Sequence, residues 1–218
     1  DVFALDLYGD GLIQLAVEHG DAAPTDQNGV QLAALVSSAG EIDAAGGVVT
    51  LTAAQASAAV ESVVNMDGVI AASSADFTGG TVVIDGADGA VTVSGAIDAS
   101  GETGGRVEVL GDAVTLAAGA DIDASGAQGG GVILVGGDYQ GRGDVPTAMT
   151  TSVENGATLN ADALANGDGG MVVVWADDRT VFNGEATARG GAAGGDGGLV
   201  ETSGKNTLAI GQDASVHA

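Results

Sequence analysis

The chain of 218 residues contains no cysteine, two prolines and only five basic residues. Without cysteine it has neither a disulfide framework nor thiol chemistry. Because 30 acidic residues oppose the five basic ones, the formal net charge is −25. This charge excludes the basic surface that nucleic acids need, and it disfavours binding to anionic membranes. No apolar stretch reaches the roughly 18 residues of a membrane-spanning helix.

The sequence also lacks cofactor and metal motifs. His19 and His217 are far apart, and no cluster of Cys and His that could form a zinc site occurs. Although there are 39 glycines, no Gly-x-Gly-x-x-Gly motif is present, and Lys205 does not complete a P-loop. We therefore expect no cofactor, no metal site and no catalytic centre.

A repeat with a step of 25 residues runs through the middle of the chain. The segment Ile97–Gly101 recurs as Ile122–Gly126, and Gly-Gly pairs at 79–80, 104–105 and 129–130 keep the same step. Short β-branched runs lie between the glycines, at 82–84, 91–93, 107–109, 114–116 and 132–135. About three such strands per 25 residues predict an all-β solenoid, the parallel β-helix. An aromatic content of only 3% suits its narrow interior.

The repeat also predicts which residues stack. Ile97 should lie on Ile122 inside the helix, and Val82 near Val107 and Val132. Glycines are expected at corners that need a positive φ or a close backbone approach, and at Gly104 we expect a positive φ. About nine rungs of roughly 5 Å each would form a rod on the order of 40 Å long.

The regularity of the repeat differs from one part of the chain to another. We expect a single β-helical segment of a longer chain, with irregular rungs over 1–68, regular rungs over 69–137, a loop-rich break over 138–156 and further rungs over 157–218. In the first part, apolar residues at 56, 60, 63 and 64 follow a helical spacing. This spacing predicts one short helix inserted near 53–64.

Several phrases in a fixed order point to a family. They are Phe3–Asp6 with Gly9–Ile13, Gly136–Gly141, Gly169–Asp178, Ala188–Gly191 and Gly194–Lys205. As a set they cover nearly the whole chain, and they resemble the filamentous haemagglutinin-like exoproteins of Gram-negative bacteria, which are exported by two-partner secretion.

The resemblance implies a right-handed parallel β-helix that is secreted, or displayed on the cell surface, through an outer-membrane translocator. It also implies a role in adhesion or in surface filaments. In this family an N-terminal secretion domain with asparagine-rich recognition motifs comes first. Because those motifs are not visible here, the chain is expected to be the segment that follows the secretion domain.

One candidate site is the tripeptide Arg142-Gly143-Asp144, which spells an integrin-recognition motif on a predicted loop. The same three letters also arise by chance in a chain with so many glycines and acids. A free Arg142 on an exposed loop would favour the adhesive interpretation.

A second candidate is a carbohydrate contact formed by Trp175, Asp177, Asp178 and Arg179. The tryptophan could stack on a sugar, and parallel β-helices host many polysaccharide lyases and hydrolases. The alternatives are a surface ion pair and a tryptophan that points outward to shield apolar surface or that plugs a turn.

The acids of successive rungs form a third feature. At a 25-residue step, Asp98 and Asp123 lie roughly 5 Å apart. They could share a calcium ion, which needs six to eight oxygen ligands. The competing interpretation, in which each aspartate forms an Asx turn at its corner, requires no metal, and we prefer it.

These features favour a non-enzymatic rod that gives a secreted adhesin reach and rigidity for surface attachment or biofilm formation. Its partners would be a receptor or glycan on another cell, the outer-membrane translocator, and copies of itself packed end to end or side by side. Two alternatives stay open: a carbohydrate-active β-helix enzyme and the subunit of a self-assembling filament.

Overall fold

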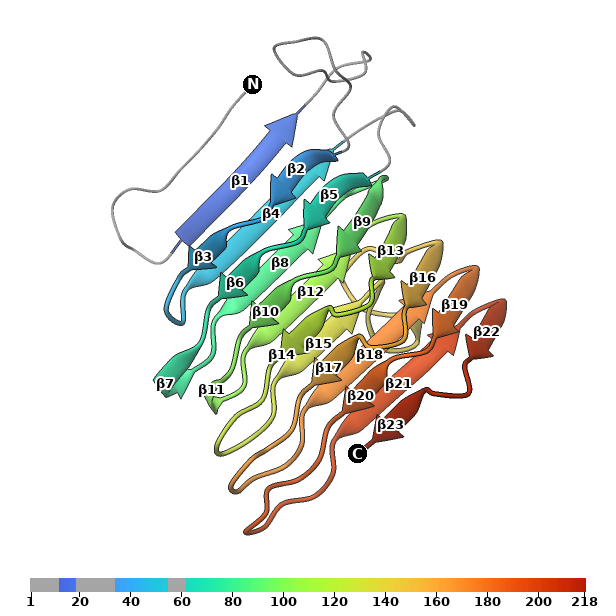
Figure 1. The fold of residues 1–218 in the computed structure, drawn as a ribbon. Coiled ribbons are helices and arrows are strands. Elements are labelled where there is room, and N and C mark those ends of the chain that lie inside the picture. The colour runs from blue at the N-terminus through green and yellow to red at the C-terminus, as the bar shows by residue number, and fades with distance from the viewer. Residues whose placement is uncertain (1–11, 19–33, 55–61) are drawn as a thin grey trace.

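The computed structural model describes residues 12–18, 34–54 and 62–218. Its strands form three parallel sheets of seven strands each, and successive rungs of the chain stack along one axis (Figure 1). Sheet I contains β1 (Leu12–Glu18), β4 (Val48–Ala54), β8 (Thr81–Asp85), β12 (Arg106–Leu110), β15 (Val132–Val135), β18 (Met171–Ala176) and β21 (Leu199–Gly204). Sheet II contains β2 (Ala34–Ser38), β5 (Ser62–Met66), β9 (Ala90–Val93), β13 (Ala113–Leu116), β16 (Thr150–Val153), β19 (Arg179–Phe182) and β22 (Thr207–Ile210).

Sheet III contains β3 (Glu41–Asp43), β6 (Val69–Ala71), β10 (Ala96–Asp98), β14 (Asp121–Asp123), β17 (Thr158–Asn160), β20 (Glu185–Thr187) and β23 (Ser215–His217). The chain visits sheets I, II and III in turn and then begins the next rung. A two-stranded sheet of β7 (Ser74–Thr78) and β11 (Gly101–Thr103) widens the corner between sheets III and I. The predicted all-β parallel β-helix is confirmed.

The register follows the predicted repeat closely but not everywhere. Ile97 pairs with Ile122, and Val82 pairs with Val107, both 25 residues apart. Val107, however, pairs with Ile133 rather than with the predicted Val132. The corner after Gly126 contains one extra residue, so the step from β12 to β15 is one residue longer than the sequence repeat suggested.

Other rungs are longer still, which changes the predicted length of the rod. Leu12 pairs with Val48, 36 residues further on, and Val132 pairs with Met171, 39 residues further on. The second of these steps contains the loop 136–149 with the short 3-10 helix η1 (Tyr139–Gly141). The described chain therefore forms seven rungs rather than nine, which corresponds to a stack of roughly 30 Å.

The helix predicted near 53–64 is wrong at both of its ends. Ala53 and Ala54 finish β4, and Ser62 begins β5. Val64 and Met66 are both fully buried, which is the two-residue alternation of a strand rather than a helical stripe. Residues 55–61 lie outside the described part of the chain.

Columns of aliphatic side chains fill the interior. In sheet III the middle residue of each strand points inward, and these residues form a single column of Ile42, Ile70, Ile97, Ile122, Leu159, Ala186 and Val216. Ile70, Ile97 and Ile122 in this column are at most 1% exposed. Burial of one such side chain contributes about 1.5–3 kcal/mol. The column is the predicted ladder that joins Ile97 to Ile122.

Glycine columns close the corner between sheets III and I. Gly80, Gly105 and Gly131 occupy equivalent places, where each N–H donates to the carbonyl of an alanine six to eight residues earlier. A Cβ on Gly105 would overlap the carbonyl oxygen of Gly80, and one on Gly131 would overlap that of Gly105. The requirement for glycine here is close backbone approach.

The positive φ predicted for Gly104 is wrong, because Gly104 is not among the residues with positive φ. Its constraint is steric instead: a Cβ would overlap the carbonyl oxygen of Ala124 and the amide nitrogen of Gly131. By contrast, a Cβ on the neighbouring Gly129 would meet nothing closer than 3.8 Å.

These two glycines allow a matched test. Gly104→Ala should destabilise the fold by about 3 kcal/mol, because the backbones of two rungs must move apart to admit one methyl group. Gly129→Ala should be neutral or slightly stabilising, since the space is open and the unfolded chain loses freedom. Equilibrium unfolding by urea measures both variants. Equal stabilities of the two would contradict the close-approach explanation.

Candidate functional site

A column of polar side chains follows the outer edge of sheet III, where each strand turns toward sheet I. The column consists of Asp43, Asp98, Asp123, Asn160, Thr187 and His217, and the apolar Ala71 interrupts it between Asp43 and Asp98. Asp98 accepts a hydrogen bond from the N–H of Ser100 at 2.9 Å, and Asp123 accepts one from Ser125 at 2.8 Å. Asn160 uses its amide oxygen in the same way, toward the N–H of Asp162 at 3.0 Å.

These contacts are Asx turns, and they confirm the interpretation that the stacked aspartates serve the corner. Each carboxylate accepts from the N–H two residues ahead, so a donor that the turn would leave unpaired is satisfied. Within 34–54 and 62–218, no three His, Cys, Asp or Glu residues converge closely enough to hold a metal ion.

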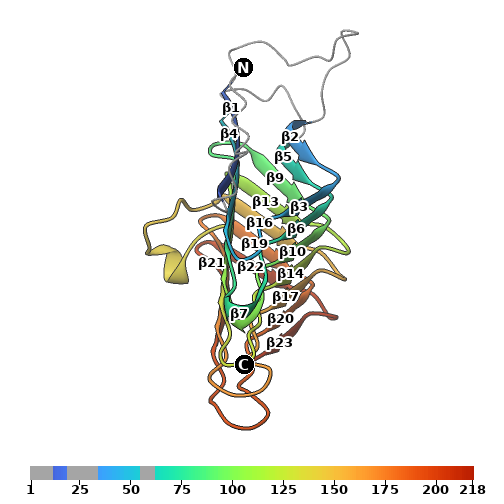
Figure 2. The same ribbon diagram turned by 90° about the vertical axis from the view of Figure 1, so that its left-hand side faces the viewer.

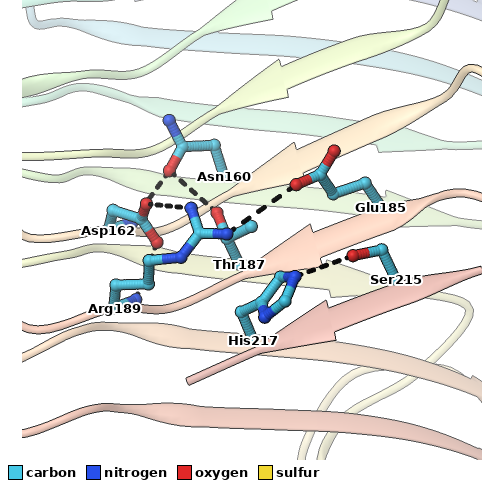
Figure 3. Close-up of polar contacts among 7 residues, drawn as sticks. All are labelled: Asn160, Asp162, Glu185, Thr187, Arg189, Ser215 and His217. Carbon is cyan, nitrogen blue, oxygen red and sulfur yellow. Dashed lines mark hydrogen bonds and ion pairs between the residues drawn. The ribbon is translucent and has the colours of Figure 1, made fainter.

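A charged cluster lies further along the same edge (Figure 3). Arg189 reaches Asp162 at 3.3 Å and Glu185 at 3.8 Å, and its N–H donates to Asp162 at 2.7 Å. Beside it, Thr187 donates to Asn160 at 3.3 Å. A cleft of about 240 Å³ lies over these residues. Because the Arg189 side chain is 48% exposed, the ion pairs themselves add little stability.

The sequence pattern did not reveal this cluster, because its two halves, 160–162 and 185–189, come from different rungs. The signal that could have revealed it is the 27-residue register between β17 and β20, which places Asn160 on Thr187. That register was hidden by the unequal lengths of the loops on either side.

Ser215 and His217 form a pair that resembles a nucleophile with its base. The Ser215 hydroxyl and His217 Nε2 are 2.8 Å apart on the exposed strand β23 (Figure 3). Residues two apart on a strand share a face, so the contact follows from local geometry. Among the described residues, no carboxylate bonds the imidazole, so the orienting third member of a catalytic triad is missing. The pair amounts to a surface hydrogen bond.

Trp175 points away from the helix interior, as predicted, but it is covered. The residue is 8% exposed, and it packs with Leu134 and Val173 on the outer face of sheet I. The loop 136–149, which stands out from this face in Figure 2, lies against the ring at Gly137 and Gly141. Trp175 therefore anchors the loop to the rod.

The residues of the carbohydrate candidate do not converge on one surface. Asp177 accepts from Trp175 Nε1 at 3.3 Å and from the Thr147 hydroxyl at 3.1 Å, while Asp178 accepts from Asn206 at 3.2 Å. Arg179 is exposed at the start of β19. Because the indole lies under the loop, the face that was predicted to stack on a sugar is not available.

The loop over Trp175 presents the tripeptide that the sequence analysis singled out. Arg142, Gly143 and Asp144 are all exposed, and Arg142 forms no ion pair within the described residues. Asp138 contacts Gly143 so closely that a Cβ there would overlap its carboxylate. Gln140 also donates its N–H to Glu201 at 3.0 Å, which ties the loop to the last strand of sheet I. The adhesive role of the tripeptide stays a prediction.

Comparison with solved structures finds a similar fold in the HMW1 secretion domain from Haemophilus influenzae. The TM-score is 0.72 at 29% sequence identity, and the match covers 95% of this chain and 57% of that one. This chain thus spans little more than half the length of that domain. No protein-family model and no curated protein matches.

This similarity supports the resemblance to two-partner-secretion adhesins at the level of the family. It falls on a secretion domain, whereas the sequence analysis expected the segment that follows one. In the described part of the chain, no helix has the length and apolar character needed to cross a membrane.

The stacked aspartates lead to a prediction about how the melting temperature depends on sodium chloride and calcium. At 0.15 M salt, repulsion reaches about 8 Å, so adjacent-rung pairs such as Asp98 and Asp123 are only partly screened. Sodium chloride should therefore raise the melting temperature gradually, and millimolar calcium at equal ionic strength should add nothing. The variant with Asp98→Asn and Asp123→Asn keeps both Asx acceptors and should show a weaker dependence on salt. A saturating rise with calcium that this variant abolishes would contradict the Asx explanation.

Proposed function

We propose that this chain is a rigid β-helical part of a secreted Gram-negative adhesin exported by two-partner secretion, and that it belongs to the secretion domain of that adhesin. The similarity to the HMW1 secretion domain, which extends over 95% of this chain, carries the proposal. It supports an outer-membrane translocator as a partner of the full-length protein. The location is then the cell surface or the medium.

The architecture suits both export and reach. Each rung makes its hydrogen bonds and its core contacts with the two rungs beside it, as in the pairing of β12 with β8 and β15. A solenoid of this kind can form one rung at a time, because no rung needs a distant part of the chain. A chain that emerges unfolded from a translocator can thus stack on the rungs that are already outside. The finished stack is a stiff spacer that holds other parts of the adhesin away from the cell.

The enzyme alternative has less support. The residues that suggested it, Trp175, Asp177 and Asp178, serve to attach the loop 136–149 and the turn after β18. The similar solved structure is a secretion domain. Non-enzymatic function therefore remains our proposal.

Export can be tested in the bacterium that carries the full-length gene. The unaltered protein and Gly129→Ala should both reach the surface or the culture medium, and Gly104→Ala should reach it in severalfold smaller amounts, because its rungs stack poorly. Immunoblots of cytoplasm, periplasm, surface and medium measure the distribution. Retention of the unaltered protein in the cytoplasm would refute the proposal.

A further inference from the structure

A cleft of about 390 Å³ opens at the corner between sheets III and I, beside β7 and β11. It lies within the size range of small-molecule binding sites. Its walls carry hydroxyl groups, two carboxylates and an exposed leucine. Its lining includes Ser73, Ser100, Ser125, Glu102, Asp123 and Leu164.

The serines form one column, because they occupy the same place in successive rungs. Asp98 pairs with Asp123 and Gly101 pairs with Gly126, so Ser100 lies over Ser125. The pairing of Ala71 with Asp98 and of Ser74 with Gly101 places Ser73 over Ser100 in the same manner. Neighbouring rungs are about 4.8 Å apart. The cleft thus presents a row of hydroxyls at a regular spacing.

Ser125 is the residue that indicates a ligand. It is 2% exposed, and its hydroxyl makes no hydrogen bond with any residue in the described part of the chain. Its backbone groups are paired, the N–H with Asp123 and the carbonyl with Gly101. The buried hydroxyls of Thr151 and Thr180, by contrast, have partners: Thr151 donates to the Trp175 carbonyl at 2.6 Å and Thr180 to that of Ser203 at 2.7 Å. Because buried polar groups in folded proteins are nearly always hydrogen-bonded, the unpaired hydroxyl of Ser125 indicates that a bound molecule supplies its partner.

We propose that this cleft binds a neutral saccharide. A serine hydroxyl both donates and accepts, as a sugar hydroxyl does, so the row can pair with several ring hydroxyls at once. The carboxylates of Glu102 and Asp123 accept from further hydroxyls. Leu164, 57% exposed, offers an apolar contact for the C–H face of a ring.

The charge of the side chains around the cleft limits which ligands it can bind. No basic side chain lines the cleft, and two carboxylates do. Together with the net charge of −25, they repel phosphates, sulfated glycans and sialylated glycans. A bare calcium ion needs six to eight oxygens, with several carboxylates to balance its charge, and the described residues bring no three acids together here. An uncharged polyhydroxyl ligand meets neither obstacle.

The test is a titration of the ¹⁵N-labelled chain with maltotriose, cellotriose and triacetylchitotriose, each followed by NMR. At least one of them should shift the amide signals of Gly101 and Gly126. Ser125→Ala should weaken this binding about five- to tenfold, because one hydrogen bond is lost. Its melting temperature should equal or exceed that of the unaltered chain, since the variant removes an unpaired buried hydroxyl. Ser152→Ala, on the outer face of sheet II, is the matched control and should bind normally.

Three results would overturn the assignment. The first is the absence of shifts at Gly101 and Gly126 with every saccharide at roughly 20 mM, enough to fill a site with a Kd of about 1 mM. The second is equal affinity of Ser125→Ala and the unaltered chain. The third is a cleft that responds to sialyllactose or to trilysine but to none of the neutral sugars. This site does not depend on the route of export, so its failure and that of the proposed function can be told apart.

Discussion

The hydrogen bonds that join each rung to the next are the interaction on which the rest of this structure depends. They hold the backbones of neighbouring rungs about 4.8 Å apart along all three sheets. At that spacing, each inward side chain must pack on the one directly above it, which is why Ile70, Ile97 and Ile122 repeat the same residue. Where two rungs approach most closely, at Gly105 and Gly131, there is no room even for a methyl group.

The same strict stacking leaves the outer surface free to vary. The loop 136–149 enters between β15 and β16, yet Val135 still pairs with Val109 and with Val174. Long insertions at a corner do not disturb the register, because the strands on either side are fixed by their own neighbours. The two candidate binding features, the exposed Arg142–Asp144 segment and the serine-lined cleft, accordingly lie on a loop and at a corner.

Stacking also brings side chains of like charge close together. A step of one rung puts Asp98 beside Asp123, and few basic residues are present to separate such pairs. The carboxylates of Asp98 and Asp123 are stabilised mainly by backbone N–H groups, since each accepts a hydrogen bond from an N–H of its own turn. These hydrogen bonds reduce the free-energy cost of repulsion between the stacked carboxylates, while the acidic surface as a whole disfavours non-specific association of the rods.

The sequence by itself determined the architecture, because the spacing of the Ile97–Gly101 repeat and of the β-branched runs is imposed by rung geometry. It also determined that Ile97 stacks on Ile122, whereas for Trp175 it left open both an outward ring and a plug near a turn. Only the tertiary structure decided the length of each rung, since inserted residues such as the one after Gly126 leave no local signal. The cover over Trp175, the cluster around Arg189 and the unpaired hydroxyl of Ser125 were decided at the same level. Each depends on the contact of one rung with another, and unequal loops separate those rungs in the chain.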